Sequence, residues 1–390
     1  MSNLEFEPLQ FLKAHSKDPG DLSTQIWDCF FSKSGSELVT CGGNSVCITE
    51  TDSFEYEKLA IKKYYAKDPR EMFLTVTETY VDNTWIVIAA GARAEVHLID
   101  AKRNIAFLVD DFQKNTKKKC PINNILIHPD NPSVIICSLN NGAVHILDIG
   151  APTYPNYVTE LSPIHQFTIP SEIFSTIYEP ESRLFLCATN KGLVGFTKDY
   201  EVVTFKLTTK LLQGASCYDE EELVDSVQNV CNGFIAVKCA LHGKIYIFNM
   251  NTITCGLRNV LSSSSGTPSI QLKPALTLNW SKTDNYFMSL SYNPYAQLLF
   301  CGDDEGCIWI YSLSPETFSS SGGSGKILDP VQILIWPEVI DKHAVGSKKI
   351  NLDVYDIVVN KVVMHPRGSY LISSTSNNYV CIWRNETLLK

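Results

Sequence analysis

The chain has 390 residues, 44% of them hydrophobic, so it is long enough to bury a large core. Its formal net charge of −9 argues against a surface devoted mainly to nucleic acid. No run of about 18 apolar residues occurs, and the first residues lack a basic stretch followed by an apolar one. Membrane insertion and secretion are therefore not expected.

Seven strand–turn–strand units follow one another along the chain. In each, an apolar run and a β-branched or aromatic run flank a short polar turn, which is the pattern of a β-hairpin. Aligned on the second strand, the units place one apolar residue each in a common column: Val46, Val96, Val144, Val194, Ile245, Ile308 and Val380. The first four intervals are close to 50 residues and the last two are longer, because of insertions. This repeat is typical of a β-propeller blade.

We therefore predict an all-β fold, a seven-bladed WD-repeat β-propeller that forms a single domain over residues 1–390. The blades are expected near residues 23–65, 73–112, 122–169, 173–208, 224–258, 276–340 and 357–390. Residues 4–15 alternate apolar and polar side chains, and we expect them to form a strand that completes the last blade.

Four insertions separate the repeats, at residues 152–163, 212–222, 251–274 and 319–325. The first three are candidate interaction surfaces, and the fourth has the composition of a linker. After it, the apolar segment 329–339 is expected to be the outer strand of the sixth blade.

The thirteen cysteines do not indicate a metal site or disulfides. No C-x-x-C motif occurs, and Cys137, Cys187 and Cys301 each lie seven residues before their column residue, where a small core side chain is needed. Free thiols are expected, in the cytosol or the nucleus.

Motifs of nucleophilic, nucleotide-binding and zinc-dependent enzymes are absent. His97 and His145 each lie one residue past the column, where packing is expected rather than metal binding. We predict no enzyme, no catalytic residue, no cofactor and no metal; a hydrolase-type propeller is the weakest alternative.

A basic run occupies residues 114–119 and includes Lys117, Lys118 and Lys119. A solvated loop is the first interpretation, and a weak contact with DNA is the second.

Aromatic residues gather where several inner strands begin. Trp27 and Leu74 lie about 20 residues before the column in the first two blades, Tyr286 and Phe287 in the sixth, and Lys361 in the seventh. Because these blades are neighbours in a closed ring, their strand starts face one mouth of the central channel. The aromatic side chains either form a cage for a methylated ammonium or pack against the adjacent blade.

These stretches resemble a known family. The segment FEPLQFLKAHSKDPGDLSTQIWDCFF from Phe6, LLFCGDDEGCIWIYSL, PVQILIWP and NYVCIW resemble the WD-repeat domain of the leucine-rich repeat and WD repeat-containing protein that associates with the origin recognition complex (ORCA). The likeness covers essentially the whole chain. More distantly, WIVIAAGARAEVHLID, PINNILIHPDNPSVIICS and YFMSLS resemble EED, the Polycomb propeller subunit.

The resemblance implies a nuclear, non-enzymatic chromatin protein. Its expected partners are histone tails carrying repressive lysine methylation and subunits of the origin recognition complex at heterochromatin. By the EED pattern, cage aromatic residues fall on Trp27, Tyr286 and Phe287, and a basic residue near the peptide falls on Lys361. The alternatives are a pure protein-interaction scaffold and an EED-like subunit of a histone methyltransferase complex.

Two features depart from the resemblance. Leu74 falls where EED has a further cage aromatic residue, and leucine lacks the ring that attracts a cation. The leucine-rich repeats that precede the propeller in ORCA-type proteins are not in this sequence, so either the sequence is one part of a longer chain or this version lacks them.

Overall fold

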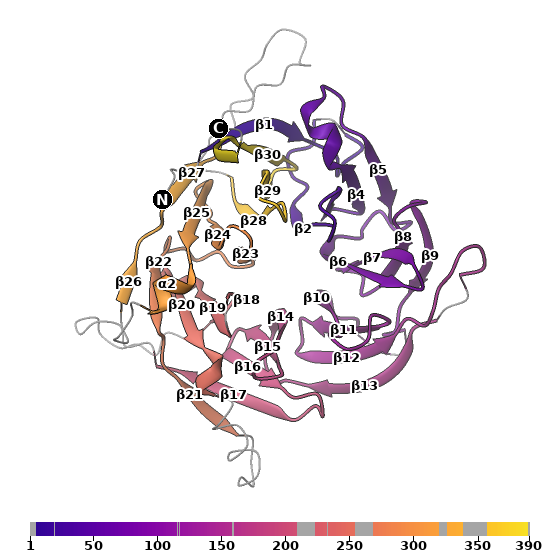
Figure 1. The fold of residues 1–390 in the computed structure, drawn as a ribbon. Coiled ribbons are helices and arrows are strands. Elements are labelled where there is room, and N and C mark those ends of the chain that lie inside the picture. The colour runs from indigo at the N-terminus through magenta and orange to yellow at the C-terminus, as the bar shows by residue number, and fades with distance from the viewer. Residues whose placement is uncertain are drawn as a thin grey trace.

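The chain folds into seven sheets that follow one another around a ring (Figure 1). The computed structural model describes residues 5–18, 20–114, 116, 118–157, 160–208, 223–231, 233–253, 268–319, 326–337 and 357–388. The predicted all-β, seven-bladed propeller is confirmed. No helix in the described ranges is long and apolar enough to cross a membrane.

The first three blades are four-stranded antiparallel sheets. The first contains β2 (Ile26–Phe31), β3 (Glu37–Gly42), β4 (Ser45–Glu50) and β5 (Ile61–Tyr65). The second contains β6 (Phe73–Val81), β7 (Thr84–Gly91), β8 (Val96–Asp100) and β9 (Ile105–Asp110). The third contains β10 (Ile122–Ile127), β11 (Val134–Leu139), β12 (Ala143–Asp148) and β13 (Ser162–Thr168).

The fourth and fifth blades each gain a fifth, parallel strand at the outer edge. The fourth contains β14 (Ile173–Glu179), β15 (Leu184–Thr189), β16 (Gly192–Phe196), β17 (Val202–Leu207) and β21 (Ser269–Leu272). The fifth contains β18 (Ser226–Asn229), β19 (Phe234–Cys239), β20 (Lys244–Asn249), β22 (Leu276–Asn279) and β26 (Lys326–Leu328).

The last two blades again have four strands. The sixth contains β23 (Ser291–Asn293), β24 (Leu298–Gly302), β25 (Cys307–Ser312) and β27 (Gln332–Ile335), and the seventh contains β28 (Val359–Met364), β29 (Tyr370–Thr375), β30 (Val380–Asn385) and β1 (Phe6–Leu12). Among the described residues, the helical segments are the short α2 (Pro315–Ser319) and the 3-10 turns η1 (Thr51–Glu55), η2 (Ala240–His242), η3 (Met250–Thr252) and η5 (Glu386–Leu388).

The predicted bounds of the sixth blade are wrong. Residues 276–340 were expected to form it, but β22 pairs antiparallel with β20 and β26 pairs parallel with β22, so both strands belong to the fifth blade. Likewise, β21 lies in the predicted insertion 251–274 but joins the fourth blade. An insertion separates β20 from β22 in the sequence. The fourth strand of the fifth blade therefore lies beyond residue 258, where that blade was predicted to end. The outer strand of the sixth blade is β27, as predicted.

The first strand closes the ring. β1 runs antiparallel to β30, from Phe6 opposite Asn385 to Leu12 opposite Val380. Figure 1 shows the indigo β1 beside the yellow β30. Segments from both ends of the sequence therefore share one blade. Their pairing covers a sheet edge that would otherwise be open.

Within the described residues, seven hydrophobic clusters make up the core, and each lies between two adjacent blades. The seven column residues all lie in the third strand of their blade and are buried. Cys137, Cys187 and Cys301 are buried and free, as predicted. Burial raises the pKa of the Cys187 thiol to about 12, so this residue behaves as an apolar filler.

Candidate functional site

A recurrent bulge shapes the start of the inner strands. Just after its first residue, the inner strand shifts register against its neighbour in five blades. A bulge re-aims a side chain and interrupts the regular pairing. The bulged residues are Trp27, Leu74, Asn123, Phe174 and Asn360.

The inner strands surround a central cavity of about 340 Å³ to which all seven blades contribute residues. Four of the five predicted site residues line it: Trp27, Leu74, Phe287 and Lys361. The fifth, Tyr286, is exposed and contacts the ring of Phe287 at a centroid distance of 5.2 Å. The structure therefore brings the predicted residues together, in a volume at the lower end of the range for small-ligand pockets.

The aromatic rings form a connected cluster. Trp27 and Phe287 lie with centroids 6.0 Å apart and ring planes at 76°. Phe174 packs edge-on against Phe287 at 5.0 Å and lies 5.5 Å from Tyr286. Two nearly perpendicular ring faces make a corner in which a cation can contact both π-systems.

Phe174 is a cluster member that sequence reasoning missed. It is the bulged residue of β14 in the fourth blade and is 5% exposed. Its position, 20 residues before Val194, falls in the same range as the predicted residues. That spacing was the available signal, but the search was confined to the neighbouring blades six, seven, one and two.

Phe287 has an unusual backbone. Its φ is +78°, in the left-handed region that a bulky residue rarely adopts. Such a conformation costs on the order of 1–3 kcal/mol and occurs preferentially at ligand sites. Here it accompanies a ring that contacts Trp27 and Phe174 across the cavity.

A belt of polar residues encircles the cavity beneath the bulges. In five blades, an inner-strand side chain accepts a hydrogen bond from a backbone N–H of the next inner strand. The pairs are Asp28 with Val76 (3.0 Å), Thr75 with Ile125 (3.4 Å), Asn124 with Thr176 (3.2 Å), Ser175 with Val227 (3.4 Å) and Ser226 with Leu290 (2.9 Å). These bonds satisfy backbone donors that a channel wall would otherwise leave unpaired, and they tie the blades together.

Lys361 completes this belt. Its Nζ pairs with the Oδ1 of Asp28, and a backbone bridge joins it to Ser289 of the sixth blade. Burial lowers the pKa of Lys361, but the Asp28 carboxylate, with smaller contributions from Cys29 and Cys41, acts in the opposite direction, and the pKa of the lysine is raised overall. The ammonium group is thus held by a carboxylate of the protein, whereas the resemblance placed it near a bound peptide.

A second carboxylate in the cavity wall belongs to Asp225. Its side chain is fully buried and forms an ion pair with Lys238, whose Nζ lies 4.4 Å from the ring centroid of Trp280. Burial raises the pKa of Asp225, while the ammonium of Lys238 acts in the opposite direction. The two carboxylates of the cavity lining, of Asp28 and Asp225, are therefore each paired with a lysine, Lys361 and Lys238. The feature of the cavity that favours a cationic ligand is its cluster of aromatic rings.

The described lining of the cavity contains neither histidine nor cysteine. That lining therefore offers neither a cysteine nucleophile nor a histidine base of the kind that many hydrolases use.

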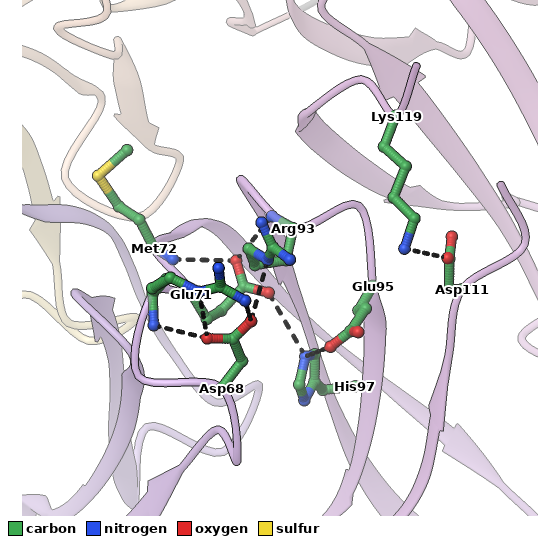
Figure 2. A network of polar contacts seen from close by, with 9 residues as sticks. Asp68, Glu71, Met72, Arg93, Glu95, His97, Asp111 and Lys119 are labelled. Carbon is green, nitrogen blue, oxygen red and sulfur yellow. Dashed lines mark hydrogen bonds and ion pairs between the residues drawn. The ribbon is translucent and has the colours of Figure 1, made fainter. Parts of the chain in front are cut away.

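The predicted basic run is only partly described. Lys117 lies outside the described residues, and Lys119 forms an ion pair with Asp111 (Figure 2). Of the insertions, 212–222 and 319–325 fall almost entirely outside the described residues, as does most of 251–274. In the segment 152–163, Tyr157 stacks on Phe107 at 4.7 Å and donates a hydrogen bond to Asp100 (2.6 Å). The described part of this segment is thus packed against the second blade.

Comparison with known proteins identifies the family. The family model described as "Leucine-rich repeat and WD repeat-containing protein 1, WD domain" matches residues 1–386. The chain belongs to this WD-domain family. The sequence resemblance to ORCA-type propellers is confirmed.

Several curated relatives carry the name leucine-rich repeat and WD repeat-containing protein 1. The Danio rerio protein is 26% identical over 411 residues, covering 97% of this chain and 50% of its own length. The Mus musculus protein is 26% identical over 409 residues (98% and 58%), and the Homo sapiens protein is 26% identical over 403 residues (97% and 58%). The chain therefore spans between half and three-fifths of the length of these relatives.

A solved structure shares the fold. A chain in the structure of a humanized mutant of the Chaetomium thermophilum Polycomb Repressive Complex 2, bound to the inhibitor GSK126, superposes with a TM-score of 0.67. The alignment covers 98% of both chains at 10% sequence identity, so the similarity concerns the fold alone.

Proposed function

We propose that this member of the WD-domain family is a non-catalytic, nuclear chromatin protein that holds a methylated lysine of a histone tail in its central cavity. The observation that carries the proposal is the convergence of rings from three blades, those of Trp27, Phe174 and Phe287, on the central cavity.

The chemistry of the cavity suits this ligand. A methylated ammonium keeps its positive charge but loses hydrogen-bond donors with each methyl group, so aromatic faces compete well with water for it. Each good cation–π contact contributes about 0.5–2 kcal/mol. The nearly perpendicular faces of Trp27 and Phe287 allow two such contacts at once.

We also propose that the chain acts as a scaffold for other proteins, in addition to binding methylated lysine. The resemblance to ORCA-type propellers implies that the chain contacts the origin recognition complex at heterochromatin. Family membership supports this part, because the whole chain aligns with the WD domain of those proteins. A pure scaffold without methyl-lysine binding is the competing function, and the experiment below separates the two.

The test is a titration of the 390-residue chain with histone-tail peptides that carry trimethylated or unmodified lysine. The wild type is expected to bind the trimethylated peptide about 10-fold more tightly, since two ring contacts contribute of the order of 1–4 kcal/mol. Trp27→Leu and Phe287→Leu keep apolar volume but remove a ring, so both should abolish the preference. Tyr295→Leu is the matched control, because Tyr295 is an aromatic residue of the sixth blade that is 69% exposed.

Equal, weak binding of both peptides by the wild type would overturn methyl-lysine recognition. Capture of origin recognition complex subunits that survives Trp27→Leu would then favour the pure scaffold.

A further inference from the structure

A buried histidine and two glutamates converge between the first and second blades, away from the polar belt. Glu71 precedes β6, Glu95 precedes β8, and His97 is the second residue of β8. His97 Nε2 lies 3.7 Å from Glu71 Oε2 and 3.7 Å from Glu95 Oε2, and the three atoms lie within 4.8 Å of one another. Figure 2 shows the three side chains pointing toward a common centre.

Two of these atoms lack the partners that buried polar atoms normally have. The side chains of Glu71 and His97 are 0% and 1% exposed. Glu71 Oε2 and His97 Nε2 have no hydrogen-bond partner among the described residues. The separation of 3.7 Å between them is too long for a hydrogen bond. Because nearly all buried polar atoms are satisfied, a bound ion is one of the few physical explanations for such a pair.

The remaining atoms of these two side chains are already engaged. Glu71 Oε1 accepts hydrogen bonds from the backbone N–H groups of Met72 (2.9 Å) and Arg93 (3.1 Å), which directs Oε2 toward His97. The Nδ1 of His97 lies 2.9 Å from the hydroxyl of Tyr64. When Nδ1 donates its proton to the Tyr64 oxygen, Nε2 carries a lone pair. An outer hydrogen bond of this kind orients histidine ligands in metal sites.

We infer that Glu71, Glu95 and His97 bind a divalent transition-metal ion, with zinc the best fit. Zinc accepts imidazole nitrogen and carboxylate oxygen at about 2.0–2.2 Å, and a tetrahedral site then separates its ligand atoms by roughly 3.4 Å. The observed 3.7 Å separations need only a small contraction. Calcium and magnesium fit less well, because they prefer all-oxygen ligand sets of six or more.

The cluster is open to solvent on one side. The side chain of Glu95 is 31% exposed, so an ion and a water molecule can approach the cluster from that side. The neighbouring cation, Arg93, forms an ion pair with Asp68 at 3.1 Å. The cluster therefore consists of two carboxylates, one buried and one partly exposed, and a buried imidazole, and a dication would neutralise its negative charge.

The ion would brace one wall of the central cavity. Glu71 is adjacent to Met72, which lines that cavity, and Ala92 donates a backbone hydrogen bond to Met72 O (3.0 Å). Gly91 packs so closely that a Cβ there would lie 1.9 Å from the same oxygen. Coordination would join the segment before β6 to the turn before β8, at a position behind the cavity wall. This inference does not depend on the proposed function.

The experiment is a zinc titration of chelator-treated 390-residue chain, with uptake measured by competition against a chromophoric chelator. One equivalent is expected to bind the wild type, to bind Glu95→Gln at least 10-fold more weakly, and to be lost in His97→Gln. His145→Gln is the matched control, because His145 holds the same position one residue past the column in the next blade. Glu95→Gln changes a partly exposed side chain, so we expect it to fold as the wild type does, which its circular-dichroism spectrum and thermal midpoint without metal will check.

Cobalt provides a second measurement. Its visible spectrum should report four-coordinate nitrogen and oxygen ligands in the wild type and in His145→Gln, and the thermal midpoint of both should rise with added zinc. A cobalt–thiolate band, or uptake that persists in His97→Gln and Glu95→Gln, would assign the metal to cysteine and overturn the inference. Absence of uptake by the wild type would overturn the inference as well.

Discussion

Lys361 and Asp28 join the last inner strand of the propeller to the first. Their ion pair lies beside the aromatic cluster and closes the belt of hydrogen bonds that links successive inner strands around the cavity. The side chains are 22% and 12% exposed, so solvent screens the pair only partly. The pair therefore connects ring closure with the shape of the candidate site.

Removing Lys361 should destabilise the protein. Lys361→Met leaves the Asp28 carboxylate partly buried without its counter-ion, and the expected loss is about 3 kcal/mol of the free energy of unfolding. Urea unfolding of Lys361→Met, Asp28→Asn and the double variant measures the coupling between the two residues. The double variant should recover at least about 1 kcal/mol relative to the sum of the single losses, whereas additive losses would show that the pair contributes nothing.

Acidification should weaken the protein through His15. This residue is 1% exposed between β1 and β2, and its ring nitrogens contact Ser45 (2.9 Å) and Thr40 (2.8 Å). Burial lowers the pKa of His15 from 6.5 to about 4. The unfolded chain therefore binds a proton below pH 6.5 that the folded chain excludes, so the stability contribution is fully present above that pH. It is lost as pH falls toward 4, at about 1.4 kcal/mol per pH unit and about 3 kcal/mol in total.

His15→Gln tests this interpretation, since glutamine does not titrate. Urea unfolding between pH 7 and pH 4 should show a shallower pH dependence for the variant than for the wild type. Parallel pH profiles would assign the acid sensitivity to other groups.

Breaking the buried ion pair of Lys238 and Asp225 should make stability depend on pH in the opposite direction from His15. Without Lys238, the protein should lose stability as the pH rises. In Lys238→Met, the pKa of Asp225 rises further above its unfolded value, so the folded state retains a proton that the unfolded chain has released. Stability then falls as pH rises through that interval. We expect a loss of about 3–5 kcal/mol at pH 8 and a smaller loss at pH 5. Equal losses at both pH values would contradict this account, and Asp225→Asn combined with Lys238→Met should restore much of the stability.

Leu74 offers a gain-of-affinity test of the cavity. It lines the cavity at a bulge equivalent to that of Trp27, in the position where the resemblance to EED places an aromatic residue. Leu74→Tyr should strengthen binding of a trimethylated lysine peptide by roughly 2- to 30-fold, the value of one added cation–π contact. The unmodified peptide is the control. An equal gain for both peptides would mean that tyrosine contacts the peptide without recognising the methylated group.

The sequence was sufficient for the architecture because each repeat carries its own hairpin signal. Val46 and Val380, at the two ends of the column, both lie in third strands, and the predicted closing strand pairs with β30. The assignment of β22 failed because an insertion separates it from its partner β20, and sequence spacing does not reveal which blade an isolated strand joins.

The candidate site was predicted only in part, because sequence spacing also does not reveal which side chains meet across the cavity. Trp27 and Phe287 were predicted from the number of residues that separate each of them from the column residue of its blade. That number indicates how far along the inner strand a residue lies. Phe174 has the same spacing from its column residue, but it lies in the fourth blade, and its contact with Phe287 of the sixth blade crosses the cavity, so adjacency of blades did not predict it. The pairing of Lys361 with Asp28 likewise depends on the bulges, which shift the register by one residue.

The most direct test of the central claim is proton NMR of a trimethylated lysine peptide bound to the chain. The account predicts that the N-methyl resonance moves upfield, because it lies over aromatic faces, and shows nuclear Overhauser effects to the rings of Trp27 and Phe287. Both effects should disappear with Trp27→Leu. An N-methyl resonance that stays at its free position while the rest of the peptide binds would contradict the claim that this cavity recognises methylated lysine.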